Sequence, residues 1–212
     1  MKDMTMESCR GFVEALGSTA PTPGGGAVVA INAAHAAGLL SMVSNITTKK
    51  NLSDQSDSVN RDLVKCMLVS VMHQEKLMKA ADADAVAFNA LMDCFKMPGT
   101  TDEEKHARSV AIVNATKNAC EPPKQTVLSC KALVDFAKIA VEQGDKSVVS
   151  DAFIACRMLA TAMRCSIYNL QINLKTLIGK DDEFVKKTNE FIARTDAVIT
   201  ELEKFIDEKC RF

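Results

Sequence analysis

The sequence predicts an all-α protein, a single domain over residues 1–212 that folds as a bundle of about seven helices. Apolar side chains recur with the spacing of one helical face along most of the chain. No segment has a convincing strand pattern, and Gly or Pro residues separate the periodic stretches. A chain of 212 residues is long enough to bury a core without disulfide bonds or a structural metal.

Three helices are predicted in the first half of the chain. The first is short and amphipathic, and Gly17 ends it. The second follows a turn at Pro21–Gly26 and has no charge before Lys49; its Ala and Gly content predicts a closely packed buried helix rather than a membrane span. Pro98–Gly99 ends the third. The predicted ranges are 5–17, 25–48 and, from an N-cap at Ser53 or Asp54, about 54–95.

Four more helices are predicted in the second half. Thr101 and Glu104 have the spacing of a capping box, which opens the first of them. Pro122–Pro123 breaks that helix, and a proline fits the first turn of the next one. Ser150 is a good N-cap, and Gly179 ends the helix that Ser150 begins. The predicted ranges are about 101–120, 123–142, 151–178 and 181–210.

The composition excludes several classes of protein. The net charge is -1, which argues against a nucleic-acid partner, since such proteins usually carry a basic excess. The eight cysteines form no C-x-x-C pair, so no zinc site or other metal site is expected. They lie mostly within apolar helical stretches, which predicts reduced, buried thiols in a cytoplasmic protein without membrane attachment.

The turn before the second helix is the first candidate site. Pro23 is followed by Gly24, Gly25 and Gly26 directly before the helix. Free backbone N–H groups at a helix start, with glycines that permit close approach, suit an anion or a carbonyl oxygen. The alternative is a tight turn with a close helix crossing.

Carboxylates supply the second set of candidates. Asp82 and Asp84 lie in an otherwise apolar stretch, but positions i and i+2 point about 200° apart on a helix and cannot share one site. Burial would raise the pKa of either carboxyl and suit it to general acid–base catalysis. Asp151 follows Ser150 at a helix start, where an acid also favours the helix dipole. Either member of the first pair could instead bond a helix terminus or a lysine.

A row of polar side chains on one predicted helix supplies the third set of candidate residues. Asn169 and Asn173, spaced i and i+4, share a helix side with Ser166 and Thr176. Buried amides require hydrogen-bond partners. They could bond a neighbouring helix or recognise the donor and acceptor edge of a heterocycle. The three histidines form no cluster.

The order of these motifs resembles one known family over about residues 5–205. Pro21–Gly26, Ser41–Thr47, Asp82–Ala85, Ser150–Asp151 and Asn169–Asn173 follow one another as in the formimidoyltetrahydrofolate cyclodeaminase / methenyltetrahydrofolate cyclohydrolase family. The resemblance implies a cyclodeaminase-like helical fold, usually dimeric, that acts on one-carbon units carried by tetrahydrofolate.

The resemblance leads us to expect a lyase that converts 5-formiminotetrahydrofolate to 5,10-methenyltetrahydrofolate and releases ammonia, as in histidine degradation. The alternatives are a methenyltetrahydrofolate cyclohydrolase on the same fold and a non-catalytic folate-binding or assembly protein. The resemblance further implies that the protein binds no cofactor tightly and forms a homodimer. A separate glutamate formiminotransferase is a possible partner. The expected acid–base residues are Asp151, then Asp84 and Asp82. The expected substrate-binding residues are Pro23, Gly24, Gly25, Gly26, Asn45, Thr47, Lys50, Asn169 and Asn173.

The chain departs from the family pattern at three positions. Ala27 stands where the family usually has Ser, Lys49 where it tends to have Gly, and His35 where a small or apolar residue is usual. Lys49 and Lys50 could attract a polyglutamate tail, or they could be solvated surface lysines.

Overall fold

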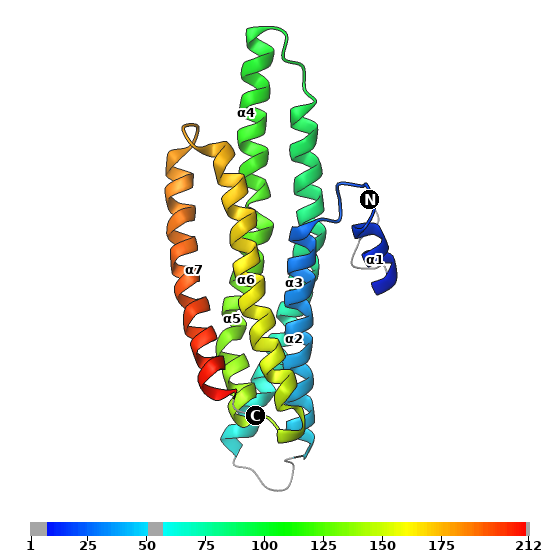
Figure 1. Cartoon of the computed structure of the whole chain (residues 1–212), viewed down its shortest axis with the longest axis vertical. Helices are drawn as coiled ribbons and strands as arrows, with labels where there is room; N and C mark the ends of the chain where they lie inside the picture. The colour runs from blue at the N-terminus through cyan, green and yellow to red at the C-terminus, as the bar shows by residue number, and fades with distance from the viewer. Residues whose placement is uncertain (1–7, 51–56, 211–212) are drawn as a thin grey trace.

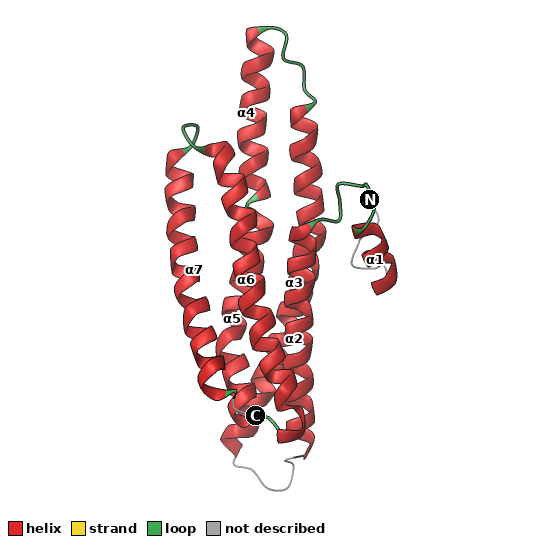
Figure 2. Cartoon of the chain, in the orientation of Figure 1, coloured by secondary structure: helices red, strands yellow, loops and turns green. Residues whose placement is uncertain are grey.

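The computed structural model of the chain describes residues 8–50 and 57–210. This part of the chain contains helices and connections and no strand (Figure 2), which confirms the all-α prediction. In chain order the elements are α1 (Cys9–Leu16), α2 (Gly25–Lys50), α3 (Asp57–Phe95), α4 (Asp102–Ala119), α5 (Glu121–Gln143), the 3-10 turn η2 (Lys146–Val148), α6 (Val149–Leu177) and α7 (Asp182–Lys209).

The observed helices match the predicted ranges to within a few residues. Ser150 is not the N-cap of α6 as predicted, because α6 already begins at Val149 and has no side-chain cap. The capping box of α4 is formed, because Thr101 accepts from the N–H of Glu104 while the Glu104 carboxylate accepts from the N–H of Thr101. Helix α5 begins at Glu121, earlier than predicted, and Pro122 and Pro123 lie in its first turn, where a missing N–H costs nothing. The predicted caps Ser53 and Asp54 lie outside the described residues.

Long antiparallel helices make up the body of the molecule (Figure 1). Helix α2 packs against α3, α5 and α6, and α6 also packs against α5 and α7. Helices α4 and α5 follow each other along one side of α3, with a break at Cys120. The upper part of α3 and most of α4 extend beyond the other helices, and α1 stands to one side of the bundle.

Small and sulfur-containing side chains fill the core. Ala33, Ala37 and Leu40 of α2 are fully buried with Cys130 and Cys156 from α5 and α6. Small side chains let helix backbones approach closely, so a core with no Trp can still pack densely. All eight cysteines are free thiols, but only half of them are buried as predicted: Cys66, Cys120, Cys130 and Cys156. Burial raises the pKa of Cys130 and of Cys156 to about 12.

Helix α2 is the one described helix that is long and apolar enough to cross a membrane. Its inner side belongs to the core, where Ala36 and Val43 are fully buried. The core role accounts for the apolar character of that side. Its outer side, in contrast, carries His35, Met42 and Asn45 exposed to solvent.

Candidate functional site

The glycine turn and Asp84 form one unit. Gly26 lies in the first turn of α2, and the carboxyl group of Asp84 on α3 lies directly against its α-carbon side. A Cβ at position 26 would overlap both carboxylate oxygens, whereas a Cβ on Gly25 would meet nothing. The backbone N–H of Ala27 donates a hydrogen bond to the Asp84 carboxylate. Gly26 is therefore required so that Asp84 can reach the start of α2.

The environment of Asp84 favours a carboxyl group that can exchange protons. Burial raises the pKa of Asp84 above its ordinary value, and the hydrogen bond from the N–H of Ala27 offsets part of that rise. The departure from the family at position 27 leaves this hydrogen bond in place, because the bond comes from the backbone. The Ala27 side chain is itself fully buried with Ala30, Ala80 and Ala81.

A cavity of about 350 Å³ lies beside this carboxyl group. Asn169 and Asn173 of α6 line the opposite wall, and the Asn173 Nδ2 donates to the carbonyl oxygen of Ala119 at 3.1 Å. That bond ties α6 to the end of α4 and fixes the orientation of one amide. The remaining lining is largely apolar or small: Pro21, Thr22, Gly24, Gly25, Gly26, Phe88, Leu91, Met92, Phe95, Ala119, Ile172 and Thr176. We call this cavity the glycine-turn cleft.

Six of the predicted residues meet in this cleft. They come from three helices and from the turn before α2: Gly24, Gly25, Gly26, Asp84, Asn169 and Asn173. Pro23 is buried within the turn itself, next to Gly24. Asp82 is not part of the cleft lining, as expected for a residue two positions from Asp84 on a helix.

The other predicted residues lie at the far end of the bundle. Thr47 is 22 positions after Gly25 on α2, which corresponds to about 33 Å along the helix axis. Its Oγ1 accepts from the N–H of Asp145 at 2.9 Å, while Lys50 Nζ bonds Asp145 Oδ1 at 2.8 Å and Ser147 Oγ at 2.9 Å. These contacts hold the connection between α5 and α6 in place.

Asn45 and Asp151 belong to the same far end. Asn45 is exposed near the end of α2, and Asp151 lies half-buried in the first turn of α6. A single chain therefore does not bring Asn45, Thr47, Lys50 or Asp151 to the glycine-turn cleft.

Sequence reasoning missed most of the apolar cleft wall. Phe88, Leu91, Met92 and Phe95 follow Asp84 at intervals of four, seven, eight and eleven residues, which is one side of a helix. The signal was present in the sequence, since these residues continue the helical side that carries Asp84. Ala119 carried no such signal, because it reaches the cleft only through the break between α4 and α5.

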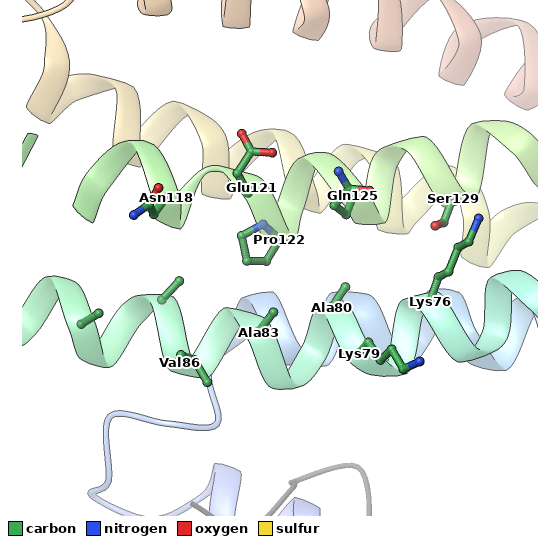
Figure 3. A pocket seen from close by; sticks show the side chains of 12 residues that line it. Lys76, Lys79, Ala80, Ala83, Val86, Asn118, Glu121, Pro122, Gln125 and Ser129 are labelled. Carbon is green, nitrogen blue, oxygen red and sulfur yellow. The ribbon is translucent and has the colours of Figure 1, made fainter. Parts of the chain in front are cut away.

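A larger groove lies on a different side of α3 (Figure 3). It measures about 760 Å³ and runs between α3 and the end of α4 with the first turns of α5. Ala80, Ala83 and Val86 form one wall and Pro122 faces them from α5, while Lys76 and Lys79 lie toward one end. It is wide and apolar, and none of the predicted site residues lines it. The smaller cleft, with its carboxyl group and two amides, is the better candidate for chemistry.

No group of three or more His, Cys, Asp or Glu side chains within residues 8–50 and 57–210 is placed to hold a metal ion. The fold and the cleft thus define a helical protein with a candidate small-molecule site beside one half-buried carboxyl group.

Comparisons with known proteins identify the family. The family model of formiminotransferase-cyclodeaminase matches residues 8–194. The chain is 36% identical over 171 residues to the methenyltetrahydrofolate cyclohydrolase of Methylorubrum extorquens, covering 81% of each chain. It is 33% identical over 182 residues to the formimidoyltransferase-cyclodeaminase of Mus musculus, covering 86% of this chain and 33% of that protein.

A solved structure supports the same family assignment. The formiminotetrahydrofolate cyclodeaminase of Thermotoga maritima superposes with a TM-score of 0.83 at 25% sequence identity, and the match covers 96% of both chains. The chain belongs to the formiminotransferase-cyclodeaminase family, an enzyme family of folate one-carbon metabolism, as the order of its motifs predicted.

Proposed function

We propose that this protein converts 5-formiminotetrahydrofolate to 5,10-methenyltetrahydrofolate with release of ammonia. The observation that carries the proposal is the half-buried carboxyl group of Asp84, with its raised pKa, in a cleft that also presents two amides. The family membership supplies the substrate class, and the name of the Thermotoga maritima structure specifies this reaction for that protein.

One carboxyl group can serve both proton transfers of this reaction. The lone pair of N10 attacks the formimino carbon on N5, a C–N10 bond forms, and the N10 proton passes to the Asp84 carboxylate. The protonated Asp84 then delivers a proton to the departing nitrogen, the carbon–nitrogen bond breaks, and ammonia leaves. A carboxyl whose pKa is raised toward neutrality suits both steps. The reaction changes no oxidation state, so the proposal includes no bound cofactor.

The rest of the cleft suits a reduced pterin ring. Asn169 and Asn173 offer amide donors and acceptors, which match the polar edge of such a heterocycle. Phe88 and Leu91 offer apolar surface for the ring faces. We therefore assign Gly24–Gly26, Asn169 and Asn173 to substrate binding and Asp84 to catalysis.

Methenyltetrahydrofolate cyclohydrolase activity is the second candidate. It is favoured by the Methylorubrum extorquens relative of that name, which this chain matches over 81% of its length. The same carboxyl could take a proton from water as it adds to the methenyl carbon and return a proton when the ring opens.

An assay of the purified protein with each folate separates these candidates. Release of ammonia from 5-formiminotetrahydrofolate supports the first, and hydrolysis of 5,10-methenyltetrahydrofolate supports the second. Tight folate binding without either turnover would show a non-catalytic folate-binding or assembly protein. The absence of both turnover and binding would reject the proposal as a whole.

We propose that the chain acts as one domain in the cytoplasm, within a route such as histidine degradation. A separate glutamate formiminotransferase would supply the formimino substrate. The chain spans about a third of the length of its animal relatives, which are named formimidoyltransferase-cyclodeaminases, so their whole-protein activities apply here only as a proposal.

A further inference from the structure

The groove between α3 and α5 is a second candidate binding site, and we call it the alanine groove. Alanines of α3 form one wall, at intervals of three and four residues that place them on one side of the helix, and Pro122 of α5 faces them (Figure 3). These small side chains leave a hollow of about 760 Å³, and small-molecule sites in proteins usually measure about 300–1,000 Å³. The alanines are Ala80, Ala83, Ala87 and Ala90.

The alanine groove and the glycine-turn cleft are separate. No described residue lines both of them. Ala83 lines the groove and Asp84 lines the cleft, and successive positions on a helix point about 100° apart. The two hollows therefore open on different sides of α3, and the chemistry proposed for Asp84 makes no use of the groove.

A positive charge without a counter-ion lies at one end of the groove. The Lys76 side chain extends toward Ser129 of α5 (Figure 3). Among the described residues no carboxylate pairs with Lys76, whereas the neighbouring Lys79 pairs with Glu75 at 3.1 Å. Burial lowers the pKa of His73, and the Lys76 ammonium lowers it further, as expected for a charge that no acid neutralises.

The Ser129 hydroxyl is a second polar group without a partner at the same end. Ser129 is only 5% exposed and lines the groove, and no group in the described part of the chain hydrogen-bonds its hydroxyl. Side chains buried this deeply are normally hydrogen-bonded to protein or to a bound molecule. An anionic acceptor placed between Lys76 and Ser129 would satisfy both groups.

The remainder of the groove suits an apolar body. Val86 adds to the alanine wall and is 51% exposed. Glu121 lies near the other end and pairs with Lys124 at 3.4 Å, so a second anion there would meet a carboxylate. Cations line the described groove only around Lys76, which fits a ligand with one anionic end better than a helix with charges along its length.

We propose that the alanine groove binds a long-chain monocarboxylate of the fatty-acid type. The carboxylate accepts hydrogen bonds from Lys76 Nζ and from the Ser129 hydroxyl, and the alkyl chain lies over Ala83 and against Pro122. Lys76 and Ala90 are 14 positions apart on α3, so the chain has about 21 Å of groove along which to leave water.

Isothermal titration calorimetry with a series of carboxylates tests the class of ligand. Hexanoate, octanoate and decanoate are used below their micelle-forming concentrations, and decylamine carries a similar apolar body with the opposite charge. We expect one decanoate per chain, an affinity that rises about two- to fourfold with each added methylene group, and no binding of decylamine. Failure to bind decanoate, an affinity independent of chain length, or equal binding of decylamine would overturn the proposal.

Substitution of Lys76 tests where the carboxylate lies. Lys76→Ala is expected to weaken decanoate binding by about tenfold or more, because hydrogen bonds to charged groups are lost, and Lys76→Arg is expected to keep most of the affinity. Lys65→Ala is the matched control, since Lys65 is also exposed on α3 but does not line the groove. Equal losses for Lys76→Ala and Lys65→Ala would reject the carboxylate position.

Filling the groove tests where the chain lies. Ala83→Leu is expected to weaken decanoate binding at least tenfold, with unchanged helix content by circular dichroism, because the position is exposed and the larger side chain occupies the groove. Ala107→Leu, at an exposed alanine of α4 outside the groove, is expected to bind like the unmodified protein. Unchanged binding to Ala83→Leu would show that the chain lies elsewhere.

Competition with a folate separates the groove from the glycine-turn cleft. Saturating tetrahydrofolate is expected to leave the decanoate affinity unchanged, since no described residue lines both hollows. If tetrahydrofolate displaces decanoate, the alkyl chain occupies the apolar wall of the cleft, and the proposal is rejected. None of the decanoate titrations requires turnover, so a failure of the proposed function leaves their outcome intact.

Discussion

Gly26 and Asp84 illustrate how one missing side chain can define a site. The carboxyl of Asp84 occupies the space that a Cβ at position 26 would fill, and the N–H of Ala27 holds it there. The resulting position is partly buried, so the charged form of the carboxyl is less favourable than in water. The sequence alone could not distinguish this arrangement from an ordinary tight turn.

Asp84→Asn is expected to reduce kcat by about 10²–10⁴-fold, because an amide cannot accept or return the substrate proton. Asp82→Asn is the control, since Asp82 does not line the cleft and the change alters charge in the same way. Steady-state kinetics with the active folate gives the comparison. Equal losses for the two variants would contradict the assignment of Asp84.

The same residue predicts how stability depends on pH. The pKa of Asp84 is raised above its ordinary value of 3.8 by burial, so the folded protein keeps this proton at a pH where the unfolded chain has lost it. Its contribution to the free energy of unfolding therefore falls as pH rises through the interval between those two pKa values. Asp84→Asn lacks this contribution. Denaturant unfolding from acidic to neutral pH should show the unmodified protein losing stability relative to Asp84→Asn, and a constant difference would contradict the raised pKa.

Gly26→Ala is expected to lower the free energy of unfolding by about 1–3 kcal/mol and to abolish turnover, because its methyl group displaces the Asp84 carboxyl. Gly25→Ala is the matched control in the same turn, where a methyl group meets no atom within 4 Å. Chemical denaturation of both variants tests this. The prediction fails if the two substitutions have the same effect on stability.

At the scale of elements, the positions of the helices in the sequence were predictable, and the contacts between the helices were not. The capping box at Thr101 and the prolines at the start of α5 are local signals, and both act as predicted. Gly25 and Asn169 are 144 positions apart, and only the packing of α2 against α6 brings them to one cleft. For the same reason, the sequence could not show that Thr47 and Asp151 lie at the other end of the bundle.

The connection between α5 and α6 depends on Asp145. The Lys50 ammonium and the Ser147 groups that bond its carboxylate hold the pKa of Asp145 well below its ordinary value. Asp145→Ala is expected to lower the melting temperature at neutral pH. The difference should shrink as acid protonates the carboxylate, since a depressed pKa stabilises the fold only where the group is charged.

Asp93→Ala provides the control for this experiment. Asp93 pairs with Lys96 at the same 2.8 Å distance but is 72% exposed, whereas Asp145 is 25% exposed. Exposed pairs of this kind contribute little. Thermal unfolding of both variants at neutral and acidic pH makes the comparison, and an equal shift for the two would refute a structural role of Asp145.

At the scale of the whole molecule, the reactivity of the buried thiols measures how often the whole fold opens. Cys130 and Cys156 are fully buried, and burial raises both pKa values to about 12, so they are protonated and shielded at neutral pH. Cys9 and Cys210 are exposed. Alkylation followed by mass spectrometry should modify the exposed pair quickly and the buried pair only at the rate of unfolding. Fast modification of Cys130 in the folded protein would contradict the described core.

The neighbour of Asn169 gives the protein a built-in optical reporter. The chain contains one tyrosine and no tryptophan, and that tyrosine is Tyr168 of α6, directly before Asn169 of the cleft. All tyrosine emission therefore comes from one phenol ring that is 60% exposed in the single chain. Its intensity and anisotropy would follow ligand entry into the glycine-turn cleft without any label attached to the molecule.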